Sequence, residues 1–397
     1  MGKGYSSSVK KILEIAGTRE VIFWGTDALS LYVYEDLAAM GYDIKYFVSE
    51  QTESNTILGK EVKPDLELLY EEKENIFIAA FILKNHGIVY QRLTDMGFVF
   101  EQDFLLYGFG GYLQKYDAID SLLGYNRFYG NTLGFQISGA EKSGTYKILA
   151  LGGSTTDPTM GNSVPWTEYL YQKLRDANID IMIINGGMAG YSANLEFYKL
   201  VRDGLLFEPD MVITYDGLND VLCLATDSDY PMLTPYAKKV FDYIEKKGDF
   251  APDTLEIRNA SSIVHGISQR TKKDTDRWKE NIRKIHAICE EFGILHIGFL
   301  QPMLTTGNAR ISERHKMLLE EAVRELPFYQ SWIEGMKDFY AGVLPFVNEK
   351  PYMTDLTSIF DGKTDIYYDF CHVTDEGNEI IADSICQKIL PYIRGEI

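Results

Sequence analysis

The chain has 397 residues, of which 45% are hydrophobic and 24% charged, the proportions of a globular protein with room for two domains. Its net charge of -19 argues against nucleic acid and anionic membrane as partners, because both need a cationic surface. No apolar run approaches the roughly 20 residues of a membrane-spanning helix. The N-terminus lacks the apolar core of a signal peptide, so we expect a cytoplasmic protein.

The first segment, residues 1–111, alternates short apolar runs with stretches of helical periodicity. Strands are expected at 20–25, 42–48 and 76–80, helices at 27–40 and 84–96, and a closing segment at 98–108. This alternation predicts a small Rossmann-like α/β domain with a parallel sheet. The turn after the first strand lacks the G-x-G-x-x-G pattern. The following helix N-terminus can hold a phosphate, while docking or homo-oligomerisation without a ligand is the alternative.

Residues 112–146 show no sustained period and are expected to form a connector, and a second α/β domain is expected over 147–397. Its strands are expected at 147–151, 179–184, 210–215 and 295–301, and its helices at 166–178, 194–203, 275–292 and 375–393. Residues 308–347 read as one or two amphipathic helices, a candidate lid or substrate-recognition insert. Several strands end in a polar or glycine-rich motif, and such ends converge on one edge of a parallel sheet.

Ser154 follows the first of these strands on a turn of small residues, 152–156. A serine hydroxyl is a weak nucleophile, so it needs exposure on a tight turn and a general base within hydrogen-bond reach. The turn therefore predicts a nucleophile, with a helix N-cap as the alternative.

Asp369 and His372 stand three residues apart, directly before the last expected helix. A carboxylate on one ring nitrogen fixes the tautomer of an imidazole and stabilises its protonated form. The adjoining Thr374 begins a good helix-start sequence, which would hold the loop rigidly. The spacing predicts a base with its orienting group, and two surface loop residues are the alternative.

Gly190 and Asn219 lie in two glycine-containing blocks between these motifs, 185–192 and 217–220. Negative charge develops on the carbonyl oxygen when a serine attacks an ester, and preorganised N–H donors stabilise it. Gly190 can offer its backbone N–H without a side chain in the way, Asn219 its side-chain amide, and Ser154 its own backbone N–H. Simple turn residues are the alternative.

Taken together, the four blocks resemble those of the SGNH (GDSL-type) hydrolases, whose name lists a serine, a glycine, an asparagine and a histidine. The resemblance covers residues 147–393, and all four blocks are intact. One departure is Gly153, which stands where the family often has an aspartate; no catalytic role passes through that position. Residues 1–111 resemble the small nucleotide-binding-like domains attached to sugar-modifying enzymes.

The resemblance implies a three-layer α/β/α fold with a parallel sheet and a serine esterase that acts through an acyl-enzyme. It implies a small acyl group, acetyl above all, on a carbohydrate or sugar conjugate, and no metal or organic cofactor. A sugar O-acyltransferase with the same triad is the first alternative, and a binding protein without catalysis is the second.

Three further residues are candidates for binding a polar substrate. Asp157 and Asp216 flank the site in sequence, and capping is their alternative role. Tyr191 could form a sugar platform with Trp166 and Tyr215, with packing as the alternative. The remaining histidines and the cysteines show no metal-ligand spacing, and the cysteines are expected to be buried thiols: His86, His265, His286, His296, His315, Cys223, Cys289, Cys371 and Cys386.

Overall fold

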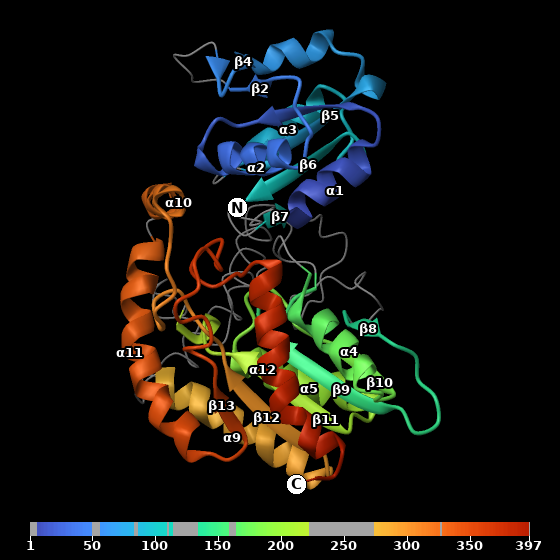
Figure 1. Ribbon diagram of the computed structural model, residues 1–397, viewed down its shortest axis with the longest axis vertical. Coiled ribbons are helices and arrows are strands. Elements are labelled where there is room, and N and C mark those ends of the chain that lie inside the picture. Colours follow the sequence, from blue (N-terminus) through green and yellow to red (C-terminus); the bar gives the residue numbers. More distant parts are fainter. Residues whose placement is uncertain are drawn as a thin grey trace, which may run out of the picture.

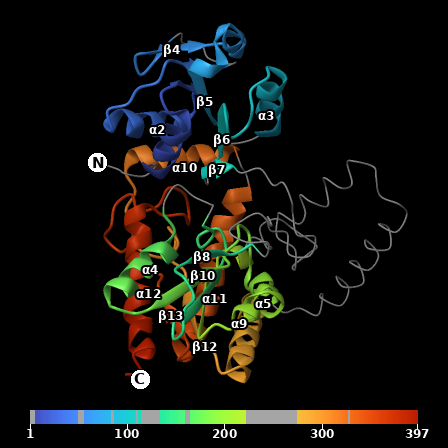
Figure 2. The same ribbon diagram turned by 90° about the vertical axis from the view of Figure 1, so that its right-hand side faces the viewer.

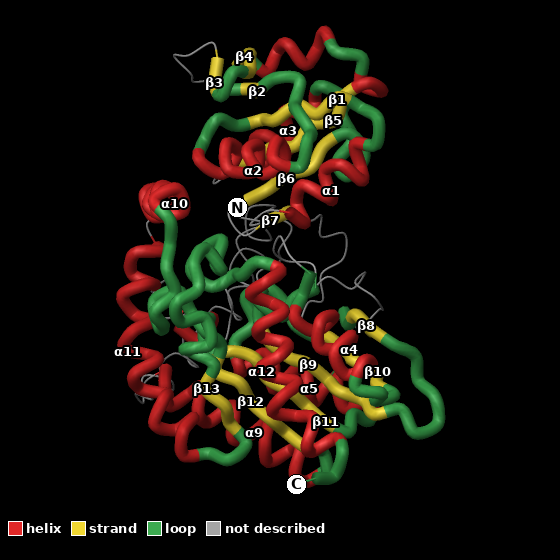
Figure 3. The backbone as a smooth tube through the Cα atoms, in the orientation of Figure 1, coloured by secondary structure: helices red, strands yellow, loops and turns green. Residues whose placement is uncertain are grey.

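The computed structural model describes residues 6–49, 56–82, 86–108, 111–113, 134–158, 164–221, 274–325 and 328–396. They form two β-sheets, each with helices packed against it (Figure 1; Figure 3). The predicted α/β class is therefore confirmed. Among the helices of these ranges, none has the length and apolar character needed to cross a membrane.

The first sheet has seven strands in the order β3-β4-β2-β1-β5-β6-β7. Strands β4, β2, β1, β5 and β6 run parallel, in the third-second-first-fourth-fifth order of a doubly wound sheet. Strands β3 and β7 are antiparallel additions at the edges. The elements are α1 (Ser6–Ala16), β1 (Glu20–Trp24), α2 (Ala28–Ala39), β2 (Phe47–Val48), β3 (Thr56–Ile57), β4 (Lys60–Lys63), η1 (Asp65–Tyr70), η2 (Lys73–Asn75), β5 (Ile76–Phe81), α3 (His86–Asp95), β6 (Phe104–Gly108) and β7 (Gly111–Leu113).

The strand expected at 42–48 is reduced to β2. Asp43 accepts a hydrogen bond from the N–H of Ile44 through its side chain, at 2.9 Å. Such a local bond competes with regular strand pairing. The N–H of Lys45 already donates to the carbonyl of Val21 at 2.7 Å, but the regular parallel register with β1 begins at Phe47.

The second sheet has six strands in the order β13-β12-β11-β9-β10-β8, all parallel except β8. Strand β8 comes from the segment expected to be a connector and forms one edge. The elements are β8 (Gln136–Ser138), β9 (Tyr146–Gly152), α4 (Trp166–Asp176), β10 (Ile181–Asn185), α5 (Ala193–Arg202), η3 (Gly204–Phe207), β11 (Met211–Asp216), α9 (Asp274–Glu291), β12 (Leu295–Leu300), α10 (Glu313–Glu325), α11 (Phe328–Glu349), β13 (Met353–Asp355) and α12 (Asp375–Ile393).

Alternating side chains of this sheet bury against different helices, which makes three layers. Ile148 and Ala150 of β9 share a buried cluster with residues of α4 and α12. Leu149 and Leu151, which point to the opposite face, share another with residues of α5 and α9. Both faces are thus covered, as the apolar runs of the strands predict.

Helix α10, from the expected insert, lies between the two sheets and against α2 (Figure 2). Glu321 on α10 accepts a hydrogen bond from the N–H of Ala28, the first residue of α2, at 2.9 Å. The rings of His315 and Tyr32 lie 6.3 Å apart. A carboxylate of the same chain therefore occupies the helix N-terminus considered above as a phosphate site.

Candidate active site

Ser154 lies just beyond β9, one of the two central strands of the second sheet. The chain turns sharply there, because the N–H groups of Thr156 and Asp157 both donate to the carbonyl of Gly153 at 3.0 Å. The Ser154 side chain is half-buried. The turn thus presents the hydroxyl at the carboxyl edge of the sheet, where the motifs were expected to meet.

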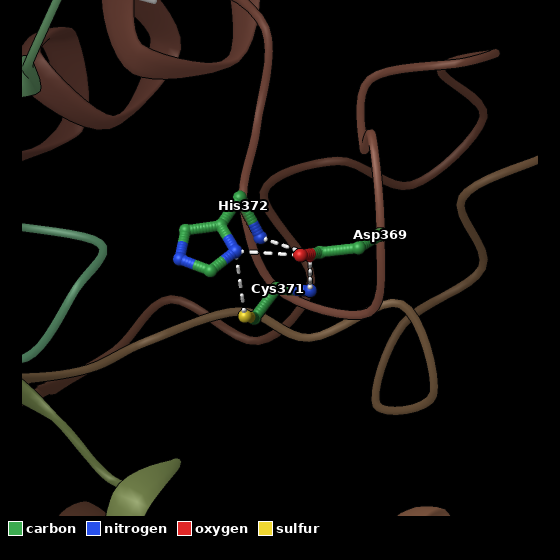
Figure 4. A group of neighbouring side chains, drawn as sticks. All are labelled: Asp369, Cys371 and His372. Atoms are coloured by element: carbon green, nitrogen blue, oxygen red, sulfur yellow. Dashed lines mark hydrogen bonds and ion pairs between the residues drawn. The ribbon is translucent and has the colours of Figure 1, made fainter. Parts of the chain in front are cut away.

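Asp369 makes two hydrogen-bonding contacts with His372 and a third with the neighbouring Cys371 (Figure 4). Nδ1 of His372 lies 2.6 Å from Oδ2 of Asp369. The other carboxylate oxygen accepts from the backbone N–H groups of His372 and Cys371, at 2.7 and 2.8 Å. The loop is closed behind them by a hydrogen bond from the N–H of Tyr368 to the carbonyl of His372, at 2.9 Å. Ring and carboxylate are therefore fixed relative to each other.

The helix that follows begins at the predicted position. Thr374 is the N-cap of α12, and its hydroxyl accepts from the N–H of Gly377 at 3.3 Å.

The pKa values of His372 and Asp369 suit a general base and the carboxylate that orients it. Burial alone would lower the pKa of His372, but the Asp369 carboxylate, helped by Asp157, raises that pKa above its usual 6.5. Burial raises the pKa of Asp369, and His372 more than offsets this, so the pKa lies below 3.8. Asp369 is thus ionised at neutral pH, and it favours the protonated imidazole.

Ser154 and His372 line one small pocket with a volume of about 20 Å³. Nε2 of His372, which faces away from Asp369 (Figure 4), is buried and has no hydrogen-bond partner among the described residues. The remaining lining residues are Thr155, Asp157, Pro165, Tyr215, Tyr368, Cys371, Val373, Asn378 and Ile381. The structure therefore brings Ser154 and His372, which are 218 positions apart in the sequence, to one pocket.

Asn219 lies against the serine turn. Its Nδ2 donates one hydrogen bond to the carbonyl of Tyr191 at 2.7 Å, which leaves its second N–H for another acceptor. A Cβ on Gly153 would overlap this amide nitrogen. The absence of a side chain at Gly153, the position that departs from the family pattern, therefore leaves room for the Asn219 amide.

Gly190 ends the loop that follows β10, with a left-handed backbone at φ +78°, which favours glycine. In the part of the chain that the structure describes, neither the N–H of Gly190 nor that of Ser154 donates to a protein acceptor. Unpaired backbone donors are uncommon inside proteins, so both are available to a ligand.

The other predicted residues lie in different surroundings. Asp157 lines the pocket. Asp216 is buried outside the pocket lining and accepts from the indole N–H of Trp278. Tyr191 is buried with Met188 and Leu195 and reaches the site through its backbone carbonyl.

A buried acid pair next to the site was not anticipated from the sequence. Glu196 on α5 and Asp216 are 0% and 3% exposed. Burial raises the pKa of Asp216 to about 7. Burial first, and then the charge of Asp216, raise the pKa of Glu196 well above its usual range. We infer that the pair retains a proton at neutral pH. Glu196 and Asp216 are 20 positions apart and lie on different elements, α5 and β11, so no local spacing predicts the pairing.

Asp369, Cys371 and His372 form the one group in the described ranges whose donor atoms lie close enough, within 4.8 Å, to hold a metal ion. Their chemistry does not fit that use. Burial above all raises the pKa of the Cys371 thiol well above 9, whereas a metal ligand is a thiolate. The Asp369 oxygens are already engaged by N–H groups.

Among the other cysteines and histidines, His315 of α10 reaches the site indirectly, because its Nε2 lies 2.8 Å from the carbonyl oxygen of Tyr368, which lines the pocket. Cys289 is buried and Cys386 half-buried, both as free thiols. His286 stacks on Tyr352, and His296 is buried beside Thr214. Cys223, His265 and the side chain of His86 lie outside what the structure describes.

The sequence matches no family model and no curated protein. Among solved structures, the chain is similar to a variant of the acetyl-xylooligosaccharide esterase Axe2 of Geobacillus stearothermophilus, with 16% identity over 64% of this chain and 95% of that chain and a TM-score of 0.37. It is also similar to a lipase from a goat rumen metagenome (13% identity, 61% and 96% covered, TM-score 0.34). A third is a lipase/acylhydrolase from Enterococcus faecalis (15%, 62% and 95%, TM-score 0.29). With scores this low, the fold and the site stand on the contacts within this chain.

Proposed function

We propose that the chain is a serine esterase that removes a small acyl group through an acyl-enzyme. Ser154 is the nucleophile, His372 the general base and Asp369 the carboxylate that orients it. The observation that carries the proposal is the pocket that Ser154 and His372 both line, together with an Nε2 of His372 that is buried and has no hydrogen-bond partner among the described residues. An imidazole whose Nδ1 is bonded to a carboxylate and whose Nε2 has no partner is suited to take a proton from a hydroxyl.

The reaction then follows in two steps. Oγ of Ser154 attacks the ester carbonyl carbon and its proton passes to Nε2 of His372. The N–H groups of Ser154 and Gly190 and the amide of Asn219 donate to the oxyanion of the tetrahedral intermediate. His372 returns the proton to the leaving alcohol, and a water molecule activated by the same ring hydrolyses the acyl-serine. Each donor contributes about 2.7–4 kcal/mol in sites of this kind, and the steps as written use no metal or cofactor.

The size of the pocket supports a small acyl group. A water molecule needs roughly 10–15 Å³ of such space, so a pocket of about 20 Å³ favours a small acyl group over a long chain. Acetylated carbohydrate is the substrate class that the resemblance to SGNH hydrolases implies. Transfer to a sugar hydroxyl would need water to be kept out by the insert, and none of its described residues lines the pocket.

The test is hydrolysis of p-nitrophenyl acetate by the wild type and Ser154→Ala. Loss of the nucleophile should lower kcat by about 10⁴–10⁶. Ser384→Ala, which removes a hydroxyl that donates to the Ile380 carbonyl of its own helix α12, is the matched control and should retain full activity. Equal rates for wild type and Ser154→Ala would overturn the proposal. A series of acetate, butyrate and octanoate esters tests the acyl size, and a preference for octanoate would contradict it.

A further inference from the structure

Asp157 is a second carboxylate at the pocket, three residues after Ser154. It ends the serine turn, with its N–H bonded to the carbonyl of Gly153 at 3.0 Å. Its side chain is 4% exposed. A carboxylate that is buried to this degree is costly unless its oxygens are satisfied, so its partners indicate what it does.

One partner is the loop that carries Gly190. Oδ2 of Asp157 accepts from the backbone N–H of Ala189 at 2.9 Å, in a buried bond. Earlier parts of the loop are held separately: the N–H of Gly187 donates to the side chain of Asn185 at 2.9 Å, and the N–H of Met188 donates to a strand-end carbonyl at 3.0 Å. Asp157 is thus the last side-chain anchor before the proposed oxyanion donor.

The second partner is the charge on His372. Among the described residues, Asp369 and the Cys371 thiol contact the ring from its own loop, and Asp157 of the serine turn lines the same pocket as His372. The thiol is neutral, because burial raises its pKa. Asp157 adds to the effect of Asp369 in raising the pKa of His372. Two carboxylates from different loops therefore stabilise the protonated ring.

We propose that Asp157 is a positioning residue of the proposed esterase, which holds the Gly190 loop in place for the oxyanion and stabilises the protonated His372 formed during attack. The inference rests on the proposed function. It assigns to Asp157 two roles that can be separated. Asparagine keeps an oxygen for the Ala189 N–H but removes the charge, whereas alanine removes both.

The test compares Asp157→Asn and Asp157→Ala with the wild type in kcat and KM for p-nitrophenyl acetate between pH 5 and 9. In Asp157→Asn, the acid limb of the kcat profile should move to lower pH by about 1 pH unit, with a plateau within about tenfold of the wild type. Asp157→Ala should show the same move and an additional loss of kcat of about 100-fold, because a misplaced donor costs about that much. Asp383→Asn, an exposed charge on α12, is the control and should leave the profile unchanged.

NMR titration of the His372 ring provides a readout that needs neither turnover nor the alanine variant. The resonance is assigned by its loss in His372→Gln, and Asp157→Asn should lower its pKa. An unchanged His372 pKa, together with an unmoved acid limb, overturns the electrostatic role. Wild-type kcat in a folded Asp157→Ala overturns the anchoring role. Failure of the esterase proposal is a separate result, since it appears as equal rates for wild type and Ser154→Ala.

Discussion

Replacing Gly153 with alanine tests how tightly the proposed oxyanion amide is held. The new Cβ would overlap Nδ2 of Asn219 and lie 3.2 Å from the carbonyl oxygen of Tyr191. The amide is not free to swing away without loss, because it donates to that same carbonyl at 2.7 Å. We expect Gly153→Ala to displace the amide by about 1 Å, the shift that restores an ordinary contact.

A displacement of about 1 Å costs on the order of 100-fold in rate, and removal of one oxyanion donor costs about 10²–10³ in kcat. Gly153→Ala should therefore lower kcat for p-nitrophenyl acetate by about 100-fold with little change in KM. Asn219→Ala should lose a similar factor. Gly335→Ala in α11, where a Cβ meets only an ordinary contact with Val221, is the matched control.

The double variant of Gly153 and Asn219 decides between displacement and general damage. Once the amide is gone, the new methyl group has room, so the double variant should be no slower than Asn219→Ala alone. Such non-additivity is expected only of residues in contact. A wild-type kcat in Gly153→Ala, or losses that multiply in the double variant, would show that the methyl group does not act by displacing the Asn219 amide.

Four further predictions concern the charged and polar groups. Asp369→Asn should lower kcat by about 10⁴ by favouring the wrong tautomer of His372; a loss below tenfold would contradict its orienting role. Because the pKa of His372 is raised and the base must be neutral, wild-type activity should fall as the pH drops through a value above 6.5, and a pH–rate profile with a limb below 6 would contradict this. Burial above all raises the pKa of Asp27 to about 6, so its protonated form stabilises the fold below pH 4 and this contribution is lost as the pH rises through about 6. Asp27→Asn should therefore lose less unfolding free energy than the wild type between pH 4 and 7, by up to about 3 kcal/mol; parallel urea-denaturation results would argue against it. Trp278→Phe removes the indole donor to buried Asp216 and should cost about 1–3 kcal/mol in the same assay, where an unchanged midpoint would speak against the bond.

Strands with strong local signals were predicted well from the sequence. Strands β9, β10, β11 and β12 are continuous apolar runs because both faces of the sheet are covered. Helix α12 matches the predicted 375–393, because Thr374 gives it a clear start. Strands β8 and β13 have three residues each, too few for a period, so the edges of the sheet could not be predicted.

The site likewise has features that could be predicted from the sequence and features that could not. Ser154 and His372 could be placed together because each follows a recognisable turn at the same edge of the sheet. The bond between Asp157 and the Ala189 N–H could not be predicted, because it depends on how two loops 32 positions apart approach each other. The contact between Gly153 and Asn219 likewise appears only once β9 and β11 are neighbours.

The contact between Glu321 and Ala28 ties together parts of the chain that are 293 positions apart. Around it, Leu319 of α10 belongs to the same buried cluster as Tyr32 and Val33 of α2. Removal of the first sheet or of α10 would therefore expose apolar surface. It would also break the hydrogen bond between the Glu321 carboxylate and the N-terminus of α2. We expect heat or urea to melt the two sheets in one transition, with limited proteolysis failing to release residues 6–113 as a stable fragment.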